Sequence, residues 1–260
     1  MRDQIDAKEF YDRLSPLYYG ETFHDDQTLT SLGRRARTLR VLDVLDRRLR
    51  RRSVVADLGC GPAQFASPLL ESGHKYIGLD ISPEMFSQTA ARLEGNPQAL
   101  FLQGSVEKVP LPDNSVDAVI CIGVIEYLPQ NVTALAEIHR ILKKPGLAIV
   151  SFPSLRFPML FVRAILRPIL GPVLRAVIPR LRRTVYVSGI EHRTLRPKKF
   201  VLEAEQSGFR LLEQTSHVYF PLLFNHRIPS AALPVYLGIE RLGEKIAPRM
   251  GANFIVCLEA

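Results

Sequence analysis

A short apolar run that ends at an acidic residue and opens into two glycines most constrains how this chain can fold. Residues 54–58 read Val-Val-Ala-Asp-Leu, and Gly59 and Gly61 follow with one residue between them. A β-branched run of this length is typical of a buried strand, and glycines in the turn let a ligand approach the backbone closely. The sequence predicts a strand that leads into a tight turn, and this turn is a candidate ligand site.

A second apolar run ends at Asp80, at the spacing where a carboxylate can accept both hydroxyls of a ribose. A dinucleotide fingerprint, G-x-G-x-x-G/A, fails here because Gln64 holds its sixth position. Asp57, beside the loop, suits an ammonium group and repels a pyrophosphate. The pattern indicates a nucleoside ligand other than a dinucleotide; the alternative is a glycine-rich turn without a ligand.

At Asp57, Gly59, Gly61 and Ala63 the sequence resembles the first motif of class I S-adenosylmethionine-dependent methyltransferases, an acidic residue followed by G-x-G-x-G. Its third glycine is Ala63 here. Residues 111–121 and 191–209 resemble two further segments of the same family. The resemblance implies an α/β, Rossmann-like fold: a seven-stranded, mostly parallel sheet with an antiparallel last strand, plus a helical cap insertion. It also implies S-adenosyl-L-methionine as the cofactor.

The resemblance assigns cofactor binding to positions along the first half of the chain. They are Tyr18, Asp57, Gly59, Cys60, Gly61, Asp80, Ile81, Ser105, Val106 and Cys121. Ser105 and Val106 stand where the family has G-D-A, so we expect adenine to meet the Val106 amide and a weaker hydroxyl contact. Tyr11 and Tyr18 match a segment that folds over the cofactor as a lid; alternatively, their rings pack an N-terminal helix on the core.

Three side chains are candidates for proton transfer. His192, which titrates near neutrality, is the first choice of general base. Glu126 and Tyr127 follow the fourth strand, where the family lines the methyl-transfer centre. Each can instead be structural. Methyl transfer from a sulfonium mainly requires alignment of nucleophile, methyl carbon and sulfur, so a base is needed only when the acceptor carries a proton.

The pattern of apolar residues places the remaining elements around this core. Strands are expected at 99–103, 147–151 and 253–258, and Ser82 and Pro83 start a helix that runs to residue 93. Pro68 fits a helix only if Ser67 caps a helix that starts there or if the proline lies in a first turn. A helix near residues 39–49 is expected to cover one sheet face through the following residues: Leu39, Val41, Leu42, Leu45 and Leu49.

Length and cysteine content bound the organisation of the chain. The 260 residues suit one α/β domain with insertions. We divide them into an N-terminal helical lid (1–50), a cofactor-binding core (51–153), a basic amphipathic cap (154–190) and a C-terminal part (191–260) with a second apolar insertion (218–236). The three cysteines are too few and too widely spaced for a disulfide framework or a metal site, and no apolar run is long enough to span a bilayer. We expect a cytoplasmic protein without a metal.

The net charge of +8 is local. No acidic residue lies between Glu137 and Glu191, and arginines alternate there with bulky apolar residues at positions Arg156, Arg163, Arg167, Arg175, Arg180, Arg182 and Arg183. Short basic amphipathic helices suit an anionic membrane surface. We therefore predict peripheral contact with the cytoplasmic membrane face; the alternative is a cap packed on the protein itself.

The resemblance is to the small-molecule branch of the family, as in ubiquinone and menaquinone methyltransferases. It implies methyl transfer to a small lipophilic acceptor of quinone, polyketide or lipid type. An RNA methyltransferase is one alternative, although residues 121–124 lack the N/D-P-P-Y/F run on which a flipped base stacks. The other is a binding subunit without catalysis, against which Gly59, Gly61 and Asp80 argue. Nucleic acid is not expected as a partner.

Overall fold

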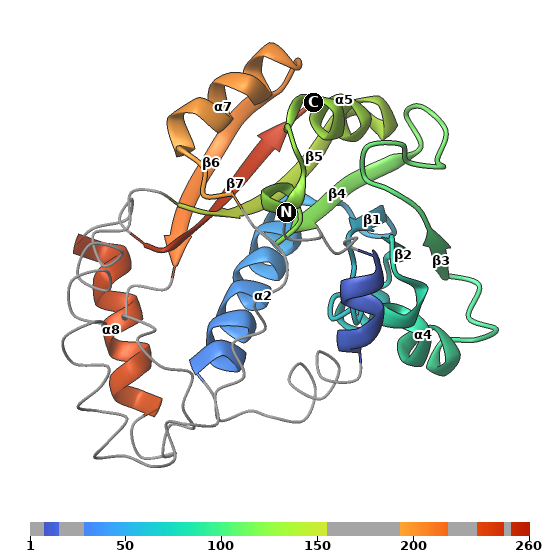
Figure 1. Ribbon diagram of the computed structural model, residues 1–260, viewed down its shortest axis with the longest axis horizontal. Coiled ribbons are helices and arrows are strands. Elements are labelled where there is room, and N and C mark those ends of the chain that lie inside the picture. Colours follow the sequence, from blue (N-terminus) through green and yellow to red (C-terminus); the bar gives the residue numbers. More distant parts are fainter. Residues whose placement is uncertain (1–7, 16–28, 155–192, 218–232, 247–250) are drawn as a thin grey trace, which may run out of the picture.

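Seven strands form one sheet in a computed structural model that describes residues 8–15, 29–154, 193–217, 233–246 and 251–260 (Figure 1). The strand order is β3-β2-β1-β4-β5-β7-β6. β1 to β5 pair in parallel, and β7 runs antiparallel to both of its neighbours. The prediction of a mostly parallel sheet with an antiparallel last strand is confirmed. The strand bounds are β1 Val54–Leu58, β2 Lys75–Asp80, β3 Ala99–Gln103, β4 Val116–Ile122, β5 Leu142–Pro153, β6 Arg210–His217 and β7 Asn253–Glu259.

Helices cover both faces of the sheet (Figure 1). The described helices are 8–15, α2 Leu29–Arg48, α3 Ala66–Glu71, α4 Pro83–Arg92, α5 Val132–Ile141, α7 Pro197–Gln206 and α8 Leu233–Ile246, with a 3-10 turn, η1, at Ile125–Tyr127. Because side chains alternate along a strand, Val55 joins the core beneath α2 and α3, while Ala56 joins the core beneath α5 and α7. Both cores are apolar, as a parallel sheet buried on two faces requires.

Local sequence signals account for two helix starts. Pro68 lies in the first turn of α3, where its missing N–H costs no helical hydrogen bond. Pro83 opens α4 directly after Ser82, as predicted. Ser82 has extended backbone, yet its hydroxyl makes no capping hydrogen bond.

The expected buried face of α2 is wrong in one position. Val41, Val44 and Leu45 are buried, whereas Leu39 is 60% exposed. Residues 39 and 41 are about 200° apart around a helix with 3.6 residues per turn, so one narrow stripe cannot hold both.

The order of the sheet places a crevice beside β1. The chain moves outward through β2 and β3 on one side of β1, and through β4 and β5 on the other. Ligands of open α/β sheets bind at the carboxyl ends of the strands where the order switches, which here is between β1 and β4.

The expected insertions lie mostly outside the described residues. The structure describes nothing of 155–192 or 218–232, and α8 begins at Leu233, within the expected second insertion. No helix among the described residues is long and apolar enough to cross a membrane. In the same part of the chain, no group of His, Cys, Asp and Glu side chains could hold a metal ion.

Candidate functional site

A cavity of about 430 Å³ opens at the carboxyl ends of β1, β2 and β4. Its size falls within the range of small-molecule sites. One half is formed by the loops after β1, β2 and β3. The other is formed by η1, α2, the helix at 8–15, the end of β6 and the start of β7. The two halves differ in the side chains that they present.

The loop after β1 requires glycine. Gly59 and Gly61 have φ values of +73° and +53°, in the left-handed region that other residues avoid. A Cβ placed on Gly59 would lie 2.2 Å from Cγ2 of Val124. Gly59 N–H donates to the carbonyl oxygen of Leu79 at 2.6 Å, which ties this loop to β2. The loop therefore presents bare backbone to the cavity.

Asp80 joins this loop to the start of α4. Its carboxylate accepts the backbone N–H of Gly61 at 2.8 Å and that of Ser82 at 3.0 Å. Burial raises the pKa of Asp80, and these amides oppose the shift. The side chain is 8% exposed and lines the cavity, so a carboxylate stands where a ribose could meet it.

Asp57 lies elsewhere. Its side chain is 2% exposed and does not line the cavity; Tyr76 Oη donates to its Oδ2 at 2.8 Å. Burial raises the pKa of Asp57 to about 7. The structure places Asp57 in a buried pair with Tyr76, outside the site. Cys121, also buried in the core, is likewise not part of the cavity wall.

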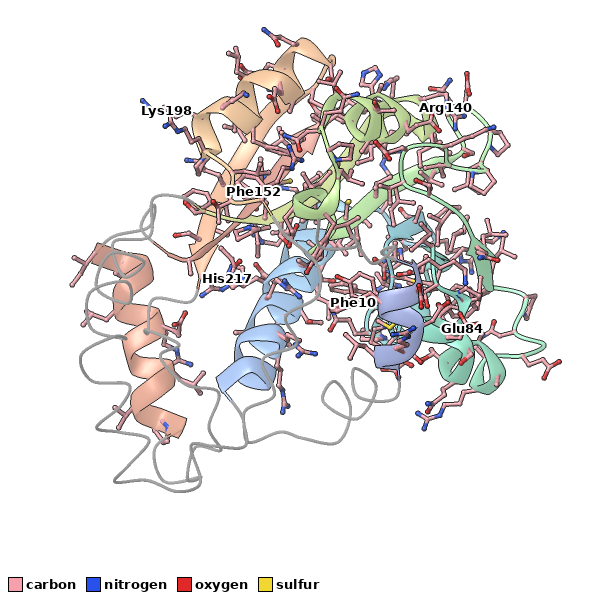
Figure 2. The ribbon with its side chains drawn as sticks, in the orientation of Figure 1. Phe10, Glu84, Arg140, Phe152, Lys198 and His217 are labelled. Carbon is pink, nitrogen blue, oxygen red and sulfur yellow. The ribbon has the colours of Figure 1, made fainter. Side chains whose placement is uncertain are left out.

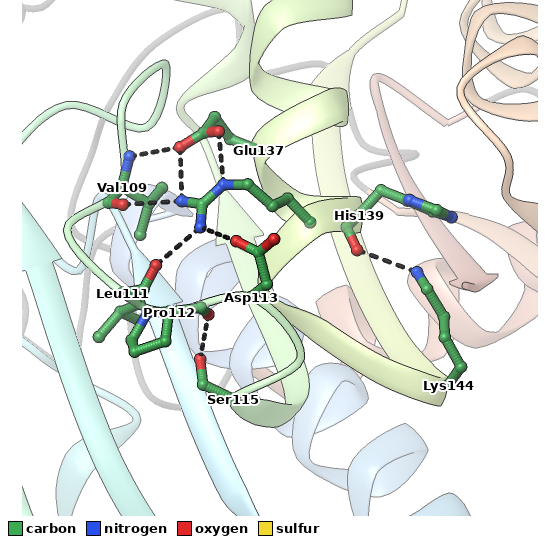
Figure 3. Close-up of polar contacts among 9 residues, drawn as sticks. Val109, Leu111, Pro112, Asp113, Ser115, Glu137, His139 and Lys144 are labelled. Atoms are coloured by element: carbon green, nitrogen blue, oxygen red, sulfur yellow. Dashed lines mark hydrogen bonds and ion pairs between the residues drawn. The ribbon is translucent and has the colours of Figure 1, made fainter.

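The connection from β3 to β4 forms the wall beside β2. Ser105 and Val106 line the cavity, and Ser105 Oγ accepts the N–H of Glu107 at 3.1 Å. Arg140 of α5 braces this connection through the carbonyl oxygens of Val109 and Leu111, at 2.9 and 2.8 Å (Figure 3). The same guanidinium is paired with Asp113 and Glu137. Cys60 and Ile81 also line this half of the cavity.

Two of the three predicted acid–base candidates lie in the part of the chain that the structure describes. Glu126 and Tyr127 line the cavity, and the ring of Tyr127 meets that of Tyr11 edge-on, with centroids 5.8 Å apart. Tyr11 thus lies against the site, a position that both a lid and a helix packed on the core allow. Tyr18 and His192 lie outside the described residues.

Glu126 is the most perturbed acid of this half. Its side chain is 8% exposed, and burial raises its pKa to about 7, against the opposing charges of Arg37 and Arg193. Arg193 holds η1 in place: its N–H donates to the Glu126 carbonyl oxygen at 2.8 Å, and Nη2 donates to the Ile125 carbonyl oxygen at 3.0 Å. A carboxyl group that titrates near neutrality suits general-base chemistry.

Sequence reasoning missed the residues that complete this half: Arg34, Arg37, His217 and Asn253. Figure 2 shows His217 close to α2. β6 runs parallel to β1–β5, so the end of β6 reaches the same edge of the sheet. A polar residue at the end of that strand was the available signal.

The sequence of this chain is similar to those of known methyltransferases. Residues 56–150 match the methyltransferase domain family. The chain is 36% identical over 106 residues to an uncharacterised methyltransferase of Mycobacteroides abscessus, covering 40% of each chain. It is 30% identical over 226 residues to an uncharacterised 37.1 kDa protein in transposon TN4556 of Streptomyces fradiae, covering 80% of this chain and 65% of the other. The matches thus span less than two thirds of either relative.

A solved structure has the same fold. Magnesium protoporphyrin IX methyltransferase from Synechocystis, with S-adenosylhomocysteine bound, superposes with a TM-score of 0.61 at 16% identity, covering 98% of this chain and 99% of the other. The fold is therefore that of class I S-adenosylmethionine-dependent methyltransferases. The match to the methyltransferase domain family covers residues 56–150, which include the glycine loop, Asp80 and η1.

The cavity fits the cofactor of this class, S-adenosylmethionine. The loop at Gly59 and Gly61 leaves room for a ligand against its backbone, and Asp80 supplies a buried acceptor. Ser105 and Val106 stand in the wall where the resemblance places adenine.

Proposed function

We propose that the protein transfers a methyl group from S-adenosylmethionine to a small lipophilic acceptor. One observation carries the proposal: a single cavity joins the glycine loop and Asp80 to the buried carboxyl group of Glu126. The first two fit a nucleoside cofactor, and the third fits proton removal from an acceptor. Ile122, Val124 and Leu128 add apolar surface to the second half, which supports a lipophilic acceptor.

In this proposal each part of the wall has one role. Asp80 accepts hydrogen bonds from the ribose, and the backbone after β1 holds the amino acid end of the cofactor. When bound, the cofactor supplies an electrophilic methyl group on a sulfonium. Glu126 takes the proton of the acceptor, Tyr127 positions it, and Tyr11 shields the site from water. His192, the first choice of general base from the sequence, lies outside the described residues and stays a candidate base.

We further propose that the enzyme takes its acceptor from an anionic membrane surface, through residues 155–185. Support comes from the sequence alone: arginines without acidic neighbours, interleaved with apolar side chains. Each arginine near such a surface contributes about 1 kcal/mol.

The cofactor assignment is tested by calorimetry with S-adenosylhomocysteine. Asp80→Asn removes the charged acceptor with little change of shape, so we expect affinity to fall about tenfold or more. Asp117→Asn is the matched control, because Asp117 also accepts a backbone N–H, that of Val54 at 2.8 Å, but does not line the cavity. Unchanged affinity in Asp80→Asn would refute the assignment. Incubation of a lipid extract with isotopically labelled cofactor, followed by mass spectrometry, then identifies the acceptor.

A further inference from the structure

Among the buried polar atoms of the cavity wall without a hydrogen-bond partner in the described residues are Oε2 of Glu126 and Nδ1 of His217. Both side chains line the cavity, and both are more than nine-tenths buried. Buried polar groups in native proteins are nearly always hydrogen-bonded, so two orphaned atoms at one cavity wall indicate a polar ligand group between them.

Arg37 of α2 adds a positive charge to this part of the cavity wall. A Cβ placed on Gly123, at the end of β4, would lie 3.6 Å from Nη1 of Arg37 and 3.8 Å from Oε1 of Glu126. Arg37 also contributes to the lowered pKa of His217, after the larger effect of burial, and Arg40 acts in the same direction. Arg37 is thus close enough to influence both side chains with orphaned atoms.

The arginine side chains and Asp80 lie on different sides of the cavity. Arg34 and Arg37 line it from α2, and Asp80 is held by backbone amides on the nucleoside side. Burial keeps the pKa of Glu126 near 7 and that of His217 well below its usual value. A guanidinium group beside a carboxyl group that titrates near neutrality suits an acceptor oxygen, because the carboxylate can take its proton while the guanidinium stabilises the negative charge that develops.

We propose that Glu126, Arg37 and His217 form the acceptor subsite, and that the acceptor presents an acidic hydroxyl, as a phenol or enol does, rather than an amine. This inference rests on the proposed methyl transfer. The hydroxyl oxygen gives its proton to the Glu126 carboxylate and takes the methyl group, so one O–CH3 bond forms and one S–CH3 bond breaks. Arg37 stabilises the negative charge that develops on that oxygen, and His217 Nδ1 contacts the acceptor.

The test uses 4-nitrophenol, whose absorbance distinguishes phenol from phenolate. The dye is titrated at about pH 6 into protein saturated with S-adenosylhomocysteine. A nearby arginine lowers the pKa of a bound acid by about one unit or more, so the phenolate-to-phenol ratio of bound dye should rise at least about tenfold. Benzylamine should not compete. An unshifted spectrum, or equal competition by benzylamine, overturns the inference.

Variants separate the acceptor subsite from the cofactor site. Arg37→Met should abolish the spectral shift, while Arg35→Met, an exposed arginine on the same helix, should retain it. His217→Gln should weaken dye binding about tenfold. Neither cavity variant should change S-adenosylhomocysteine affinity by more than about threefold. If Arg37→Met lowers the affinity for S-adenosylhomocysteine as much as the affinity for the dye, Arg37 binds the cofactor and the inference is wrong.

The outcomes also separate this inference from the proposed function. Protein that binds no S-adenosylhomocysteine contradicts the proposed function itself. Protein that binds S-adenosylhomocysteine but leaves the dye spectrum unshifted contradicts only the acidic-hydroxyl subsite.

Discussion

Gly59 should be the least replaceable residue of the cofactor loop, because two separate costs meet there. An alanine would hold φ near +73°, which costs about 1–2 kcal/mol for a residue with a Cβ. Its Cβ would also lie 2.2 Å from Cγ2 of Val124, and relief of such overpacking costs about 1–3 kcal/mol. We expect Gly59→Ala to lower the free energy of unfolding by about 2–5 kcal/mol.

A second substitution separates the two costs. Val124→Ala removes both methyl groups that the new Cβ would meet, so the double variant should keep only the backbone cost. The coupling energy between the two sites should then be about 1–3 kcal/mol, in the direction of rescue. Gly95→Ala is the control: φ is +77° there, but a Cβ would meet nothing within 4 Å, so the backbone cost alone is expected.

The assay is urea denaturation of the parent, both single variants, the double variant and Gly95→Ala at one pH. Each unfolding free energy comes from linear extrapolation, with comparison of the slopes as a check that the denatured state is unchanged. A coupling energy within about 0.5 kcal/mol of zero refutes the reasoning, because it means that Gly59 does not make room for Val124.

Three further outcomes are expected. Because the pKa of Asp57 is raised from 3.8 to about 7, the folded protein keeps a proton that the unfolded chain releases, so stability falls as pH rises from 4 to 7. The free energy of unfolding of Asp57→Asn, measured by urea denaturation, should therefore exceed that of the parent by up to about 4 kcal/mol at pH 8 but not at pH 4. Equal differences at both pH values contradict this. Glu126→Gln should slow methyl transfer to the identified acceptor about 100-fold and abolish the rise in rate through pH 7, whereas a rate within threefold of the parent makes Glu126 structural. The parent should co-sediment with anionic liposomes at low salt, and Arg163→Glu with Arg167→Glu should release it; a parent that stays in the supernatant rules out membrane contact.

The nucleoside half of the cavity could be predicted because its residues lie within one stretch of sequence. The glycines after β1, Asp80 at the end of β2, and Val106 after β3 each follow a strand that periodicity reveals. Parallel strands bring their carboxyl ends to one edge, so these local patterns meet in space. Asp57 was assigned to the cofactor through the motif, but alternation along β1 places its side chain beside Tyr76 in a buried pair.

In the other half of the cavity, Glu126 and Tyr127 could be predicted because they follow β4 directly. The residues from α2 and β6 could not, because long-range packing decides which of them reach the cavity. Arg34, Arg35, Arg37 and Arg40 look alike in sequence, and only the contacts of α2 determine that Arg34 and Arg37 reach the cavity while Arg35 is exposed. His217 comes from a strand far along the chain. His217 is buried close enough to Arg37 for the two to interact, and sequence periodicity does not predict that proximity.

This division of the cavity also limits what sequence similarity conveys. The segment that matches the methyltransferase domain family contains the glycine loop, Asp80 and Val106, but Arg37 precedes it and His217 follows it. Two proteins can therefore share this domain, and with it the methyl donor, while differing in every residue contributed by α2 and β6. Arg37 and His217, unlike Glu126, lie outside the matched segment, so their side of the cavity can change while the glycine loop and Asp80 stay the same.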